Sequence, residues 1–115
     1  MIAARWTLVV RAGSKVERER VESLDEALFA ARKRLVALEP TARRETARAL
    51  VREIPPGDQV AARLELRGPR RARGGVDLRG DGTLAAWTGL ISKRVLEPDR
   101  GEDALGALGR ALAAR

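Results

Sequence analysis

Polar and apolar residues alternate over residues 5–11, which is the two-residue period of a β-strand, with Trp6 and Leu8 on one face. Gly13 follows, where a tight turn needs a residue that tolerates positive φ. Four of the six residues over 16–21 are charged, which predicts a return strand at a sheet edge, because charge there discourages pairing with another chain. The sequence therefore predicts an N-terminal β-hairpin.

A capping box begins the first predicted helix, since the Ser23 hydroxyl can accept from the Glu26 amide while the Glu26 carboxylate reaches back. Apolar residues then recur every three or four positions and form one stripe: Leu24, Ala27, Leu28, Ala31, Leu35 and Leu38. We expect this helix to end at Pro40, because the residue before a proline is pushed out of helical conformation.

Residues 41–54 fit more than one structure. Their apolar positions have helical spacing, but Pro55-Pro56-Gly57-Asp58 follows at once, and such a segment between two β-prone runs is typical of a hairpin turn. We expect a helical turn or loop over 41–46 and a strand over 48–54, paired with an amphipathic strand over 59–67.

The C-terminal half continues with a loop over 68–75, a short strand over 76–79 and a tight turn at Gly80-Asp81-Gly82. A long strand over 83–96 and a helix over 102–114 follow. Two glycines, at 106 and 109, weaken this helix by about 1 kcal/mol each relative to alanine. They make sense if the helix lies close to another backbone or is loosely held.

The order of these elements, β-β-α-β-β-β-β-α, contains no repeated strand–helix–strand alternation. It predicts an α+β fold, with a mostly antiparallel sheet of four to six strands and two helices packed on one face. A length of 115 residues fits a single domain over 1–115.

Charge and composition narrow the functional classes. The chain has 23 basic and 16 acidic residues, and this excess can favour nucleic acid, an anionic surface or an acidic protein partner. A G+C-rich genome explains arginine in place of lysine, but it does not explain the excess. Cysteine and histidine are absent, which excludes disulfides and removes the usual zinc ligands. No signal peptide or spanning segment is evident, so we expect a cytoplasmic protein without membrane contact.

One strand–loop–strand unit gathers most of the candidate nucleic-acid contacts. Its basic residues are Arg63, Arg67, Arg70, Arg71, Arg73 and Arg79. The segment 70–73 is expected to project from the sheet as a flexible basic tip that contacts phosphates through bidentate guanidinium groups. The alternative is a solvated loop in an arginine-rich chain, and the loop lacks aromatic residues for stacking on bases.

A second candidate surface involves three hydrophobic side chains. Phe29 and Val36 lie seven residues apart on the first helix, opposite its apolar stripe. Either the second helix or the 41–46 segment covers them, or they form an interface between copies of the chain. Trp6 and Trp87 are expected to pack on a sheet face, and Trp87 is also a candidate interface residue.

Catalysis has little support in the residues. Without histidine or cysteine, a nucleophile would have to be a hydroxyl or a carboxylate, and no serine sits in a nucleophile elbow. We expect no enzymatic activity, cofactor or small-molecule ligand. The leading hypothesis is a small non-enzymatic binding or assembly module that contacts a protein partner, in the first place itself as a homo-oligomer. The alternative is a protein that binds the nucleic-acid backbone through the loop 67–73.

Overall fold

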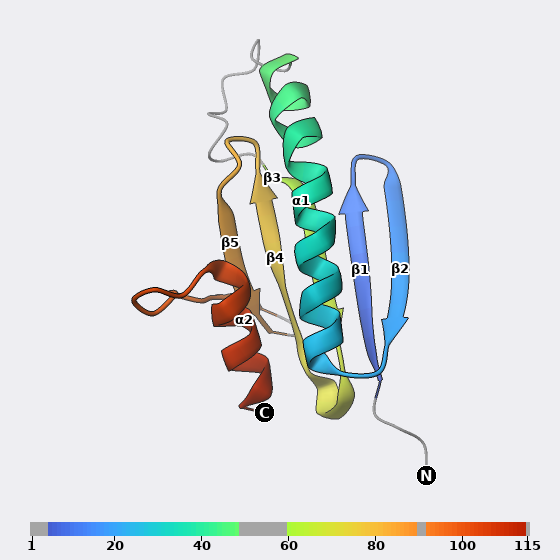
Figure 1. Ribbon diagram of the computed structural model, residues 1–115, viewed down its shortest axis with the longest axis vertical. Coiled ribbons are helices and arrows are strands. Elements are labelled where there is room, and N and C mark those ends of the chain that lie inside the picture. The colour runs from blue at the N-terminus through green and yellow to red at the C-terminus, as the bar shows by residue number, and fades with distance from the viewer. Residues whose placement is uncertain (1–4, 49–59, 90–91, 115) are drawn as a thin grey trace.

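A computed structural model describes residues 5–48, 60–89 and 92–114 of the chain, and for residues 42–48 it describes the backbone alone. Within these ranges the chain forms six strands and two α-helices in the order β-β-α-β-β-β-β-α, which confirms the predicted α+β fold. Both helices lie on the same face of the sheet (Figure 1), as the sequence predicts. In the part of the chain described, no helix is long and apolar enough to cross a membrane.

The sheet is antiparallel throughout, and its spatial order is β2-β1-β3-β4-β5-β6. The strands are β1 Trp6–Ala12, β2 Lys15–Val21, β3 Val60–Arg67, β4 Arg73–Arg79, β5 Leu84–Thr88 and β6 Arg94–Val95. The charged strand β2 lies at one edge of the sheet, as its composition predicts.

The first helix, α1, spans Leu24–Arg48, so the prediction that it ends at Pro40 is wrong. Its start follows the predicted capping box, with the Glu26 amide donating to the Ser23 hydroxyl at 3.1 Å. A proline deprives the carbonyl four residues earlier of its N–H partner. Here that carbonyl belongs to Val36, which is 72% exposed, so water can hydrate it and the helix continues.

The continuation of α1 also corrects the expectations that follow it. The segment 41–46, expected as a turn or loop, is helical, and Arg48, expected as the start of a strand, is the last residue of α1. The rest of that expected strand, 49–54, and the expected hairpin turn at 55–58 lie outside the described residues.

The predicted strand over 83–96 is two strands, β5 and β6, separated after Thr88. Gly89 has φ of +134° and donates its amide to the Arg73 carbonyl at 3.1 Å, which turns the chain out of β5. The extra strand gives the same number of strands after α1 as expected, although the strand expected at 48–54 is not among those described. The observed order of elements therefore still equals the predicted order.

The hydrophobic core lies between the helices and one face of the sheet. Its sheet side consists mainly of Trp6, Leu8, Val10, Leu64, Leu66, Val76, Leu78 and Ala86. The second helix, α2, spans Ala104–Ala113 and adds Leu105, Leu108 and Leu112. A Cβ on Gly109 would lie 2.8 Å from Leu28 Cδ1, so this glycine lets α2 approach α1, as expected of a glycine retained in a helix.

We predict that Pro40→Ala raises the free energy of unfolding by roughly 1–3 kcal/mol, because it restores a helical N–H and removes a ring clash within α1. Urea denaturation followed by circular dichroism measures this change. An unchanged or lower stability would contradict the continuous helix.

Candidate functional site

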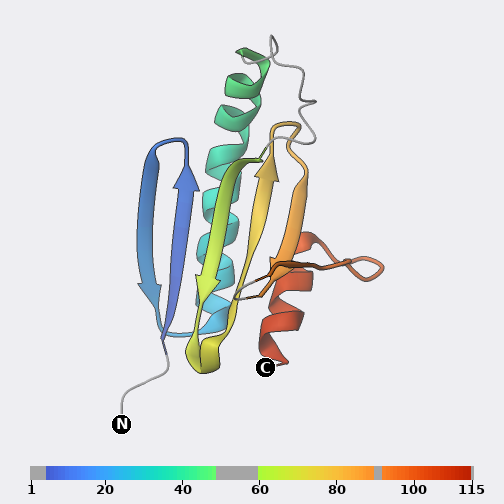
Figure 2. The ribbon, with the colours of Figure 1, turned by 180° about the vertical axis from the view of Figure 1, so that it is seen from behind.

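The face of the sheet opposite the helices carries six arginines on four neighbouring strands. Seen from behind, as in Figure 2, this outer face has no helix on it in the described residues. Side chains alternate along each strand, so the neighbours of the core residues Leu8, Leu64 and Val76 point outward. We call the resulting set the arginine field: Arg11 on β1, Arg18 and Arg20 on β2, Arg63 and Arg67 on β3, and Arg73 on β4.

A buried row crosses the middle of this outer face. Register places Val9 opposite Glu65, Glu65 opposite Gly75, and Gly75 opposite Trp87. Val9, Glu65 and Trp87 are only 1%, 4% and 2% exposed, although no described helix covers them. Long arginine side chains can bury their aliphatic stems on such a surface and keep their charged ends in water. In this row, Arg67 and Arg73 contact Glu65, and Arg63 lies over the ring of Trp87.

Five arginines of the field flank that row, and Arg18 lies at the end of it, opposite Val9. On one side, Thr7 lies opposite both Arg20 and Arg67, and Arg67 lies opposite Arg73. On the other side, Arg11 lies opposite Arg63. Hydrogen bonding between strands thus fixes the spacing of the cationic groups.

Glu65 holds two of these arginines from below. Arg67 Nε lies 2.5 Å and Arg73 Nε lies 2.8 Å from Glu65 Oε1. Burial alone raises the pKa of Glu65, but the hydrogen bonds and charges of Arg67 and Arg73 outweigh it and leave the pKa below its ordinary value. One buried carboxylate therefore stays ionised and aligns two guanidinium groups.

Asp77 holds a third arginine in the same way. Arg63 meets it with two parallel hydrogen bonds, Nε to Oδ1 at 2.7 Å and Nη2 to Oδ2 at 3.0 Å. The hydrogen bond to Asp77 is the main cause of a raised Arg63 pKa. Both carboxylates, Glu65 and Asp77, are at most 9% exposed. The positive charges therefore lie outermost and the negative charges beneath them.

Trp87 forms the floor of the face rather than a surface anchor. Its Nε1–H donates to Asp77 Oδ1 at 3.1 Å, and a Cβ on Gly75 would lie 2.7 Å from its ring. Arg63 Cζ and Lys93 Nζ lie 5.6 Å and 4.7 Å from the ring centroid, within cation–π distance. The expectation that Trp87 packs on a sheet face is confirmed, on the face opposite Trp6.

Arg70 and Arg71 form the exposed part of the turn between β3 and β4. Both have left-handed backbones, with φ of 58° and 59°, which costs roughly 1–2 kcal/mol per residue for a side chain other than glycine. The turn is closed by a hydrogen bond from the Gly68 amide to the Ala72 carbonyl at 2.9 Å, and Ala72 is 4% exposed. The predicted flexible tip is therefore a short, anchored turn.

The predicted loop over 68–75 is also too long, since β4 begins at Arg73. Gly74 and Gly75 belong to β4, and neither position has room for a side chain. A Cβ on Gly74 would lie 2.8 Å from the Trp87 carbonyl, and one on Gly75 would meet the Leu64 carbonyl.

The other predicted site residues lie in two places, Arg79 on the sheet and Phe29 and Val36 on α1. Arg79 is the last residue of β4, at the opposite end of that strand from the β3–β4 turn. Phe29 and Val36 are 63% and 72% exposed on α1, on the helix side of the sheet. Neither of the expected covers shields them. The structure does not bring Trp87 to this surface.

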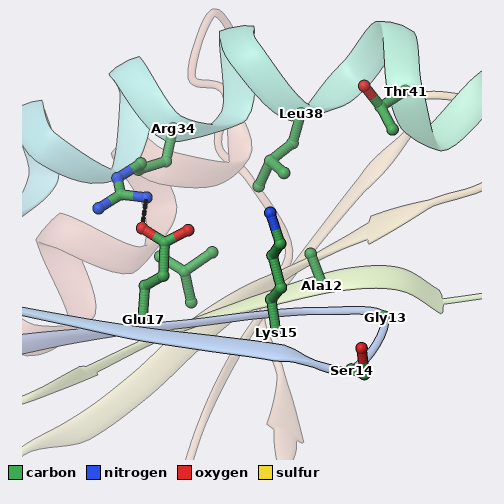
Figure 3. Close-up of a pocket in the computed structure, with 9 residues that line it drawn as sticks. Ala12, Gly13, Ser14, Lys15, Glu17, Arg34, Leu38 and Thr41 are labelled. Atoms are coloured by element: carbon green, nitrogen blue, oxygen red, sulfur yellow. Dashed lines mark hydrogen bonds and ion pairs between the residues drawn. The ribbon is translucent and has the colours of Figure 1, made fainter.

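A cleft of about 450 Å³ lies between α1 and the β1–β2 hairpin (Figure 3). Arg34 Nη1 contacts Glu17 Oε2 at 2.6 Å across it, and the hydrogen bond and charge of Arg34 lower the pKa of Glu17. Lys15 extends toward Leu38 beside this pair. The cleft thus contains one matched ion pair and one further cation.

Sequence reasoning missed Arg11, Arg18 and Arg20. A signal for two of them was present, because Arg18 and Arg20 are two residues apart in an expected strand and must share a face. That this face continues the face of Arg63 and Arg67 depends on the pairing of β1 with β3, which the pattern of a single strand does not contain.

Within the described residues, no three acidic side chains are grouped closely enough to hold a metal ion. Comparison of the chain with protein-family models, curated proteins and solved structures found no match.

We predict that Glu65→Gln destabilises the protein by about 1–3 kcal/mol near neutral pH, because Arg67 and Arg73 lose a charged partner. A carboxylate whose pKa is lower in the folded state than in the unfolded state stabilises the protein at pH values above the unfolded-state pKa. That contribution fades as the pH falls below about 4.5 and through the folded pKa. The stability difference between wild type and variant, measured by urea denaturation, should shrink from about pH 7 to about pH 3. An equal difference at both pH values would contradict an ionised Glu65.

Proposed function

We propose that this protein binds the phosphate backbone of nucleic acid through the arginine field, without catalysing a reaction. The observation that carries the proposal is the arrangement of charge on the outer face, where the carboxylates are buried and the arginines that contact them lie closer to solvent. Three arginines of the field, Arg63, Arg67 and Arg73, contact the buried carboxylates of Glu65 and Asp77. The other three lie on the neighbouring strands β1 and β2 of the same face. A ligand that approaches this face meets positive charge first.

The chemistry of guanidinium suits phosphate. Each guanidinium has five N–H donors in a fixed plane, so a carboxylate that contacts Nε does not exhaust them. Three arginines of the field are oriented by buried partners, so less side-chain freedom is lost when a phosphate binds. The net charge of +7 adds long-range attraction for a polyanion.

We predict that Arg18→Gln/Arg20→Gln weakens binding to nucleic acid without unfolding the protein, because both side chains are exposed on the edge strand β2. Glutamine keeps part of the aliphatic stem and removes the charge. The slope of log affinity against log salt should fall in magnitude by roughly 1–2, measured by fluorescence anisotropy with labelled DNA.

The matched control is Lys33→Gln/Arg100→Gln, which removes two exposed positive charges outside the arginine field. It should leave the salt slope unchanged. If wild type shows no binding at low salt, or if both variants lower affinity equally, the proposed function is rejected.

A second candidate function, self-association, is favoured by one separate observation. Phe29 and Val36 are exposed on the same side of α1, and a groove of about 210 Å³ beside Val36 continues over Leu84 and Leu105. Apolar area of this kind gains free energy when a second copy covers it. We propose this surface as the contact of a homo-oligomer.

We predict that Phe29→Glu shifts the protein toward the monomer, as measured by light scattering at micromolar concentration. Val95→Glu is the matched control, because Val95 is 68% exposed but lies on the short strand β6. A wild-type monomer that Phe29→Glu does not change would reject self-association through α1.

A further inference from the structure

We infer that the nucleic acid bound by the arginine field is a duplex, and that Arg70 and Arg71 extend into one of its grooves. This inference rests on the proposed function and names the ligand class of the same face. Three independent features carry it: the burial of the aromatic rings, the dimensions of the arginine field, and the strained backbone of the β3–β4 turn.

The aromatic residues are not placed to bind a single strand. Proteins that bind single strands without sequence preference stack bases on exposed aromatic rings. This chain has three aromatic residues, and Trp6 and Trp87 are only 7% and 2% exposed. The third, Phe29, lies on α1, on the other side of the sheet. The outer face therefore offers phosphate contacts without a stacking platform.

The dimensions of the field suit two strands of phosphates. Arg67 and Arg63 are four residues apart on β3, so the two flanks of the buried row are separated by roughly 13 Å. Across the sheet, the field extends over β2, β1, β3 and β4, which is about 14 Å. The grooves of B-DNA are about 6 Å and about 12 Å wide. Arginines on opposite flanks can therefore contact backbones on opposite sides of one groove.

The β3–β4 turn continues the field beyond the end of the strands. Arg67 and Arg73, the residues on either side of it, are paired in register and both belong to the field. The base of the turn packs against the core. Gly68 lies so close to Trp6 that a Cβ would be 2.5 Å from its ring, and Ala72 is buried. Arg70 and Arg71 are exposed at its tip. A duplex that lies on the field meets this tip.

The backbone at the tip shows that arginine is not the residue the turn itself favours. At Gly13, Gly82 and Gly101, where φ is also positive, the chain has glycine. Arg70 and Arg71 adopt positive φ consecutively with full side chains. Backbone strain of this kind persists where the surrounding structure imposes it, and it clusters at ligand-binding sites. Arginine inserted into a groove of DNA is attracted by the concentrated negative potential there.

The first test compares a labelled duplex of about 20 base pairs with its single strand, in DNA and RNA forms, by anisotropy at matched salt. We expect wild type to bind a duplex at least about 10-fold more tightly than the single strand. Equal or tighter binding of the single strand in both forms overturns the inference and leaves the proposed function standing. No binding to any of the four probes at low salt overturns the proposed function itself.

The second test uses Arg70→Gly/Arg71→Gly. Glycine relieves the strained backbone, so the thermal midpoint should rise by about 4 °C or more. Affinity for the duplex should nevertheless fall by at least about 10-fold, with a smaller loss for the single strand. Lys33→Gln/Arg100→Gln, with the same change in charge, should lose less than about 3-fold. A lower thermal midpoint, or equal duplex losses in the two variants, overturns the role of the turn.

Discussion

The pairing of two buried carboxylates with arginines is the interaction on which the outer face depends. Glu65 and Asp77 lie in a sheet surface that no described helix covers, and each is buried by the guanidinium groups that it binds. A buried charge without a partner is strongly destabilising. The arginines therefore stabilise the fold through their inner N–H groups and remain able to bind an anion through their outer ones. Structure and proposed function use the same side chains.

The apolar side chains on the two faces of the sheet are covered by different groups. On one face, Leu and Val side chains pack beneath α1 and α2, and Gly109 brings the two helices together. On the other, Val9 and Trp87 are buried, and Arg63 and Lys93 lie over the Trp87 ring. In the described part of the chain, helices cover only one face of the sheet. Three of the arginines therefore have a structural use in this face.

The sequence predicted the features that depend on local pattern. The N-terminal hairpin, the Ser23 capping box and the position of both helices on one face follow from periodicity and turn chemistry. It failed where tertiary context decides. Whether a helix passes Pro40 depends on the exposure of the preceding turn, and whether Gly75 is in a loop or a strand depends on Trp87 lying across it. The arginine field was only half found, because β1–β3 pairing joins residues distant in sequence.

A double-mutant cycle on Glu65 and Arg73 tests the central claim most directly. The stabilities of wild type, Glu65→Gln, Arg73→Met and the double variant give the coupling free energy between the two side chains. If the buried carboxylate holds the arginine in place, this coupling is about 1–3 kcal/mol in favour of the native pair. A coupling near zero would mean that the two groups are merely adjacent, and that Glu65 does not hold Arg73 in place.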